Sequence, residues 1–274
     1  MRIERGNSDF YQQNNIREKS IQKNLEKMAT GKRINRASDD AAAMAMSQEM
    51  EKFNRGYQVA SENIQAGISA LQISDGGAST VMDMLQRQRE LAVQSATGTM
   101  TDEQRHALDQ EYQGLSAEID RQSQSTDFNG QQVNDGSGKL SDGSGKVVTG
   151  GGGSDVIALP PSDLRLNSLG LSSSSIDSQA KSSQAISDLD AAMRKVSDNR
   201  SGHGAVINQL NYAYSQQQNQ LVNGTQAQSN IEDLDYAKAV TEQVRDSILF
   251  NANNATMGQT HQMARAQLMA LLGS

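Results

Sequence analysis

Between Met46 and Leu85, residues suited to a buried helical seam recur in alternate steps of four and three. The positions are Met46, Met50, Phe53, Tyr57, Ala60, Ile64, Gly67, Leu71, Ser74, Ala78, Val81 and Leu85. A sustained alternation of this kind is the seam of a coiled coil rather than one face of a straight helix. We therefore predict a single long helix here. Gly67, Ser74 and the neighbouring pair Gly76–Gly77 predict a soft spot in its middle.

The same rhythm returns in three later segments, 108–122, 186–221 and 234–255. Thr101 and Gln104 match a capping box that would open the first of these helices, and Asn129–Gly130 is a strong turn signal. The only prolines are adjacent, Pro160 and Pro161, so long stretches on either side are free to be helical. With four Phe and no Trp, the chain suits thin helical packing better than a thick core.

The middle of the chain has a different composition. DGSGK occurs at 135–139 and again at 142–146, and KVVT and DVIAL then flank a run of glycines. This pattern predicts a small β-hairpin, followed by a serine linker at 172–175. The predicted fold is mainly α, an elongated antiparallel coiled-coil helical bundle folded back as a hairpin, with a small β-hairpin and glycine-rich region in the middle.

Composition excludes several classes of protein. There is no cysteine for disulfides or thiolate ligands, and the net charge of -7 argues against binding nucleic acid. No apolar run approaches the roughly 18 residues that a membrane span needs, so we predict no membrane insertion. The N-terminal MRIERGNSDFYQQNN lacks the apolar region of a signal peptide. If the protein leaves the cell, we expect export without a cleaved signal peptide.

Sites for catalysis or cofactors are weakly supported. Two Gly-Lys pairs lack the upstream glycine and the following Ser or Thr of a phosphate-binding loop. The histidines His106, His203 and His261 are far apart, whereas a zinc site needs several clustered ligands. No nucleophile-elbow pattern occurs. The sequence therefore predicts a protein that is not an enzyme, with no cofactor and no metal.

Five segments resemble the bacterial flagellins. They are TGKRINRASDDAAAMAMSQEM at 30–50, QRQRELAVQSATGT at 86–99, EIDRQSQSTDFNG at 118–130, SNIEDLDYAKAV at 229–240 and ILFNANNATMGQTHQMARAQLMALL at 248–272. Lys32 stands where an apolar residue is common in the family, and the first dozen residues carry more charge than usual. The start MRI and TGKRIN are also similar to hook–filament junction proteins, so a junction adaptor is the alternative.

The resemblance implies a subunit that polymerises into the extracellular flagellar filament for swimming motility. It also implies five parts: an inner-core helix and spoke (1–40), rod helices (41–130), a β-hairpin and Ser/Gly linker (131–178), a rod helix (179–224) and a second inner-core helix (225–274). Expected partners are further copies of the chain, hook-associated junction and cap proteins, the flagellar export apparatus with a C-terminal export chaperone, and the host innate receptor for flagellin.

The resemblance also assigns residues. The spoke, where neighbouring subunits would meet and pair opposite charges, comprises Lys32, Arg33, Asn35, Arg36, Asp39 and Asp40. From the residues alone, we expect Ser38 or Asp39 to cap the following helix, with both aspartates in its first turn, near the helix dipole.

Two further sets follow. The residues matching the receptor-binding surface are Arg87, Leu91 and Glu111, and Leu91 lies off the seam through Leu85 and Ala92, so we predict that it is exposed. Packing between the terminal helices is expected to involve Ile21, Leu25, Met28, Leu234, Val244, Ile248, Leu268 and Leu271. Because apolar positions are sparse at both ends, we expect these ends to be disordered in the monomer and to fold on docking.

Overall fold

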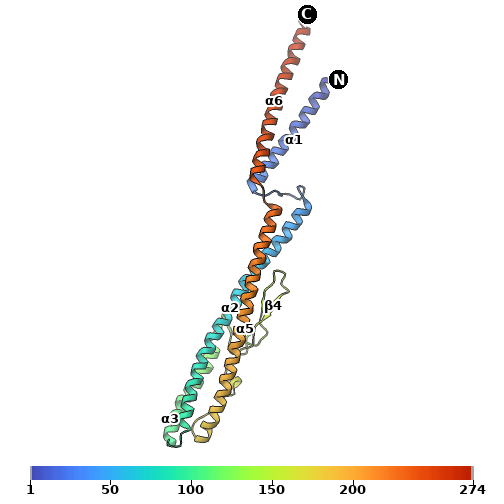
Figure 1. Ribbon diagram of the computed structural model, residues 1–274. Coiled ribbons are helices and arrows are strands. Elements are labelled where there is room, and N and C mark those ends of the chain that lie inside the picture. The colour runs from blue at the N-terminus through green and yellow to red at the C-terminus, as the bar shows by residue number, and fades with distance from the viewer. Residues whose placement is uncertain (1, 273–274) are drawn as a thin grey trace. The chain divides into compact units, whose positions relative to one another are not determined.

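The structure, a computed structural model, describes the backbone of residues 2–272 and the side chains of residues 11–263, 265, 266 and 269. The fold is mainly helical, as predicted (Figure 1). The helices are α1 (Arg2–Thr30), α2 (Ala41–Ser95), α3 (Asp102–Ser125), α4 (Leu166–Leu169), α5 (Gln179–Glu232) and α6 (Tyr236–Leu272). The strands are β1 (Asp127–Phe128), β2 (Gln131–Gln132), β3 (Lys146–Val148) and β4 (Val156–Ala158).

The chain divides into two compact units. The terminal unit comprises Met1–Lys52 and Asn223–Ser274, and the central unit comprises Phe53–Val222. The division at residues 40 and 224 that the resemblance implies, between spoke or inner core and rod, stays a prediction. Each unit is described separately below.

In the central unit, α2 and α5 run antiparallel, which confirms the predicted hairpin (Figure 1). Two ion pairs mark their register: Arg89 with Asp190 at 2.7 Å and Asp75 with Arg200 at 2.8 Å. Every predicted seam position from Ala60 to Leu85 is buried. The first turns differ: Met46 and Phe53 are 52% and 37% exposed, because the hydrophobic clusters on α2 begin only at Ile64.

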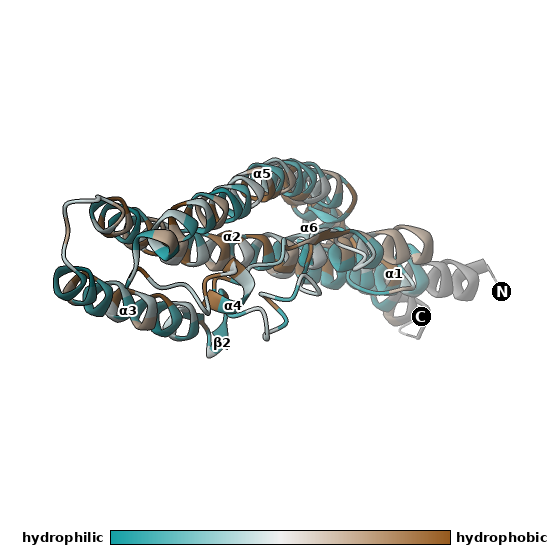
Figure 2. Cartoon of the chain, turned by 90° about the horizontal axis from the view of Figure 1, so that it is seen from below, coloured by the Kyte–Doolittle hydropathy of each residue, from teal (hydrophilic) through white to brown (hydrophobic). Residues whose placement is uncertain are grey.

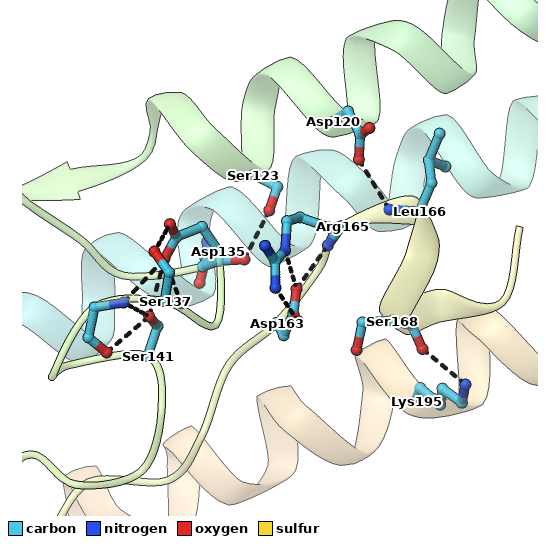
Figure 3. Close-up of polar contacts among 12 residues, drawn as sticks. Asp120, Ser123, Asp135, Ser137, Ser141, Asp163, Arg165, Leu166, Ser168 and Lys195 are labelled. Carbon is cyan, nitrogen blue, oxygen red and sulfur yellow. Dashed lines mark hydrogen bonds and ion pairs between the residues drawn. The ribbon is translucent and has the colours of Figure 1, made fainter. Parts of the chain in front are cut away.

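Helix α3 folds back so that α2 lies between α3 and α5 (Figure 2). The predicted capping box opens α3: the Thr101 side chain accepts from the Gln104 amide, and the Gln104 side chain accepts from the Thr101 amide. Helix α4 is held from both sides (Figure 3). Its Leu166 amide donates to Asp120 of α3 at 2.9 Å, and Lys195 of α5 donates to the Ser168 carbonyl at 2.9 Å.

The predicted hairpin is present as β3–β4, with Val147 paired to Ile157. The two DGSGK repeats form equivalent turns, in which the Asp135 and Asp142 carboxylates accept from the amides of Ser137 and Ser144. Figure 3 shows the first of these turns, which also takes in Ser141. The Asn129–Gly130 turn joins β1 to β2, with φ of 52° and 74°, as the turn signal predicts.

Helix α2 runs unbroken from Ala41 to Ser95, as predicted, and this range includes the expected soft spot. Its small residues make room for residues 131–178, which we call the middle segment. A Cβ on Gly67 would lie 2.6 Å from Val147 of β3, and one on Gly56 would lie 2.2 Å from the Gly151 carbonyl oxygen.

In the terminal unit, α1 and α6 pack antiparallel through polar contacts. The side chain of Asn14 donates to Asn254 at 2.9 Å, and Ser20 donates to Asp246 at 2.9 Å. Among the described side chains of this unit, Ile34 and Ala239 are the only buried hydrophobic ones. The terminal unit therefore has almost no hydrophobic core of its own.

Candidate functional site

Two connections of the terminal unit pair with each other. The α1–α2 connection, residues 31–40, meets the α5–α6 connection, residues 233–235, in an antiparallel bridge between Lys32 and Asp233. The Leu234 amide donates to the Gly31 carbonyl at 3.0 Å, and the Arg33 amide donates to the Glu232 carbonyl at 2.6 Å. Gly31 has a φ of 72°, which favours glycine and ends α1. We call residues 31–33 and 232–234 the bridge.

The bridge is reinforced by Glu232. Its carboxylate forms an ion pair with Lys32 and accepts hydrogen bonds from Ser47 at 2.7 Å and from Gln228 at 3.2 Å. The Lys32 ammonium lowers the pKa of Glu232, and Glu232 in turn raises the pKa of Lys32. The Glu232 side chain is 13% exposed but that of Lys32 is 53% exposed, so solvent partly screens this pair.

The other two cations of the predicted spoke also find partners within the unit. The Arg33 guanidinium donates to the Ile231 carbonyl at 2.6 Å. Arg36 pairs with Glu26 of α1 at 3.0 Å. The spoke therefore ties α1, the 31–40 connection and the end of α5 together.

Asp39 and Asp40 have different roles from those expected. Asp40, rather than Ser38 or Asp39, caps α2, because its side chain accepts from the Ala43 amide at 2.9 Å. Asp39 lies before the helix and accepts from the amides of Asn35 and Arg36, both at 3.2 Å. It also pairs with Lys23 at 2.6 Å, which lowers the pKa of Asp39 to about 2.

The spoke charges were expected to pair between subunits, and within this chain each already has a partner. The partners that the sequence analysis missed are Lys23, Glu26, Ser47, Ile231 and Glu232. One signal was available: the acidic run Glu232–Asp233 lies inside a family-like segment and complements the cations at 32–36.

The residues expected to pack the terminal helices are only partly covered. Ile21, Met28 and Leu234 are half-buried, whereas Leu25, Val244 and Ile248 are 51%, 53% and 61% exposed. Leu268 and Leu271 lie outside the described side chains. Further exposed apolar side chains on the same two helices are Ile16, Val240, Leu249, Met263 and Met269.

The predicted receptor surface lies on the central unit. Arg87 of α2 pairs with Glu111 of α3 at 2.8 Å, and both are about half exposed. The expectation that Leu91 is exposed is wrong, since it is 1% exposed. Leu91 faces away from the α5 seam, but the returning helix α3 covers it, and it shares a hydrophobic cluster with Tyr112 and Ile119.

The described residues offer no metal site. Among them, no group of three or more His, Cys, Asp or Glu side chains is placed to hold a metal ion. No helix, over the part of the chain that the structure describes, combines the length and apolar character needed to cross a membrane. What the terminal unit offers is the hydrogen-bonded bridge beside two helices with uncovered apolar side chains.

Comparison with known proteins agrees with this arrangement. Residues 7–139 match the bacterial flagellin N-terminal helical region, and residues 186–272 match the bacterial flagellin C-terminal helical region. A flagellin of Halalkalibacterium halodurans is 36% identical over 91% of each chain. The chain belongs to the bacterial flagellins. The flagellar filament 33 kDa core protein of Treponema phagedenis is 34% identical to this flagellin over 92% of each chain.

One solved structure is similar to this flagellin in fold, but not closely in sequence. The putative flagellar hook-associated protein from Vibrio parahaemolyticus has a TM-score of 0.58 at 16% identity, covering 71% of this flagellin and 100% of that chain. The flagellin is a structural, non-enzymatic subunit of the flagellar filament. Its family implies self-assembly, so the uncovered faces of α1 and α6 are its candidate assembly site.

Proposed function

We propose that this flagellin builds the filament by packing the exposed apolar side chains of α1 and α6 against the same helices of neighbouring copies. The observation that carries the proposal is that the terminal unit buries few hydrophobic side chains and leaves several exposed. Ile34 and Ala239 are its only buried hydrophobic residues among the described side chains, while Ile16, Val244 and Ile248 are each more than half exposed. Fully burying an exposed side chain of this kind contributes roughly 1.5–3 kcal/mol, and these side chains, which are half to two-thirds exposed, would gain a similar share of it each. A polymer thus supplies the core that one copy lacks.

The bridge then acts as the spoke between inner and outer layers. Its hydrogen bonds and ion pair within the chain fix where α1 ends and α6 begins, so each subunit presents the two helices in the same way. Contacts that do not close into a ring produce an open helical polymer, which is the form of a filament.

We also propose that α1 and α6 become ordered on assembly. The hydrogen bonds between them are single polar pairs, such as Asn14–Asn254 and Ser20–Asp246, which contribute little against the entropy of ordering two helices. Amide exchange on dilute monomer tests this: exchange at the unprotected rate in residues 11–28 and 240–263 is expected. Protection of both segments in the monomer would contradict it.

Seeded polymerisation tests the assembly site. Monomer is mixed with short filament fragments, and growth is followed by electron microscopy for the parent protein, Ile248→Ser and Val222→Ser. The two replaced side chains are similarly exposed, at 61% and 66%, but Val222 lies on α5 in the central unit. Ile248→Ser is expected to slow growth at least tenfold, and Val222→Ser to grow like the parent.

Two outcomes would count against the proposal. If Ile248→Ser grows as fast as the parent, the exposed face of α6 is not part of the assembly site. Binding of the parent to fragment ends without elongation would instead favour the hook–filament junction adaptor.

The remaining partners are proposed from the family. Because the filament lies outside the cell, subunits need the flagellar export apparatus, and hook-associated junction and cap proteins would bind the filament ends. An export chaperone would cover the C-terminal part of α6, where Met263 and Met269 are 60% and 77% exposed. For the host innate receptor, we propose Arg87 and Glu111 as contacts and leave out the buried Leu91. Receptor signalling by monomeric Arg87→Ala and Glu111→Ala variants tests that assignment.

A further inference from the structure

The core of the central unit is interrupted by a layer of polar side chains. Among the buried residues, one hydrophobic cluster ends at Ala78 on α2 and Val196 on α5. The other ends at Leu71 and Leu210, with the partly buried Val206 and Ile207 of α5 packed against it. The residues between these limits include Ser74 and Asp75 on α2 and Asn199, Arg200 and His203 on α5. We call these five residues the polar layer.

Most of the polar layer is satisfied by hydrogen bonds. Ser74 donates to the Asn134 side-chain oxygen at 2.5 Å, and Asn199 donates to the Pro161 carbonyl at 2.8 Å. Arg200 donates to the two carboxylate oxygens of Asp75 at 2.8 and 3.4 Å.

His203 is the exception. It lies on the buried stripe of α5 between Val196 and Leu210, seven residues from each, and is 1% exposed. Neither Nδ1 nor Nε2 has a hydrogen-bond partner within the protein. A neutral imidazole has one N–H and one acceptor nitrogen, and a protonated ring has two N–H groups and a charge. A proton added here therefore enters a site that provides no acceptor for it.

The charges near His203 do not compensate for burial. Burial lowers the pKa of the ring; Asp75 of α2 acts to raise this pKa, and Arg200 of α5 acts to lower it. The attraction of Asp75 is already shared with Arg200 through their ion pair. The middle segment meets the layer through the neutral side chains of Asn134 and Ser162.

We propose that His203 makes the polar layer an acid-sensitive joint, where protonation of the buried ring loosens α5 from α2 while the hydrophobic clusters on either side stay packed. The sign follows from linkage. The folded protein holds the ring neutral below the ordinary value of 6.5, whereas the unfolded chain binds a proton there. The stability is fully present above about pH 6.5 and is lost as the pH falls towards the depressed folded value.

The test uses urea unfolding of the full chain, as monomer, at pH 7.5, 6.5 and 5.5. Three proteins are compared: the parent, His203→Gln and His106→Gln, the last being a matched change at an exposed position on α3. Between pH 6.5 and 5.5 the unfolding equilibrium constant of the parent is expected to rise up to about fivefold relative to His203→Gln, because the unfolded ring is already half protonated at pH 6.5. His106→Gln should follow the parent. An equal pH slope for the parent and His203→Gln would overturn the proposal.

A second measurement decides the matter if His203→Gln does not fold. The ring of His203 is titrated by NMR in the parent protein, alongside amide exchange corrected for its intrinsic pH dependence. The expected result is a ring that stays neutral well below pH 6.5, with protection lost first at residues 74–78 and 199–206. A ring that titrates at its ordinary value without local loss of protection would overturn the proposal.

Discussion

Gly77 of α2 lies directly against Asn134 of the middle segment: a Cβ atom on Gly77 would be 2.5 Å from the Asn134 side-chain nitrogen and 2.9 Å from the Thr126 hydroxyl. Its neighbour Gly76 has nothing within 4 Å of the same position. Two adjacent glycines of one helix thus meet opposite environments. Only Gly77 is needed for a close approach.

Replacing each glycine by alanine should change stability in opposite directions. Gly76→Ala removes backbone freedom from the unfolded chain and should stabilise the protein by about 0.5–1 kcal/mol. Gly77→Ala pushes the middle segment away from α2 and should destabilise it by about 1–3 kcal/mol. Urea unfolding of the two variants measures both values. Equal stabilisation by the two changes would show that the middle segment yields without cost.

Asn134 should be one of the most sensitive positions of the central unit. Its side chain accepts hydrogen bonds from Ser74 and Ser162 and donates to the Ser74 carbonyl, and Asn134 is 1% exposed. Asn134→Ala leaves these buried groups unpaired and should cost about 2–3 kcal/mol in urea unfolding. Asn211→Ala, at an exposed position of α5, is the matched control and should cost less than about 0.5 kcal/mol.

Glu232→Ala should loosen the bridge. The change removes the acceptor for Lys32, Ser47 and Gln228, although the backbone bond from Arg33 to residue 232 can still form. We expect amide exchange at Arg33 and Leu234 to speed up about tenfold, equivalent to about 1.4 kcal/mol of local stability. Glu49→Ala, at an exposed position of α2, should leave both amides unchanged. If Arg33 and Leu234 exchange at the same rate in Glu232→Ala as in the parent, the backbone hydrogen bonds alone hold the bridge.

Asp39 should give the terminal unit an acid limit separate from that of His203. Its pKa is lowered to about 2 from 3.8, chiefly by Lys23, so its contribution is complete above about pH 4 and lost as the pH falls towards 2. Because Lys23 is 49% exposed, solvent screening reduces that contribution to about 1 kcal/mol. NMR titration of the Asp39 carboxyl should show its pKa rising towards 3.8 in Lys23→Met. An unchanged value there would contradict the assignment to Lys23, and Lys19→Met on the same helix serves as the control.

Local signals in the sequence predicted local structure well. The heptad spacing, the Thr101–Gln104 capping box and the Asn129–Gly130 turn each depend on residues a few positions apart. The resulting long helices, hairpin and turn are all present. The family-like segments likewise predicted the filament subunit.

Features that depend on distant segments were predicted less well. Leu91 was expected to be exposed because its neighbours on one helix cannot indicate that α3 returns to cover it. The spoke cations were recognised, but Arg33 binds a carbonyl 198 residues further along the chain. Asn134 stood in a glycine-rich stretch where asparagine is typical of turns, and its contact with Ser74 spans 60 residues.

The bridge also determines how the terminal unit responds to a pulling force. α1 and α6 pack antiparallel and make polar contacts one by one along their length, so a force drawing their free ends apart would load a single contact at a time. Contacts that are loaded one at a time break at low force, so the two helices would peel apart easily. Peeling would stop at the bridge, where the Gly31–Leu234 and Arg33–Glu232 hydrogen bonds and the Lys32–Glu232 ion pair lie close together and share the load. The bridge would thus serve as a mechanical stop between the two helices and the segments that continue into α2 and α5.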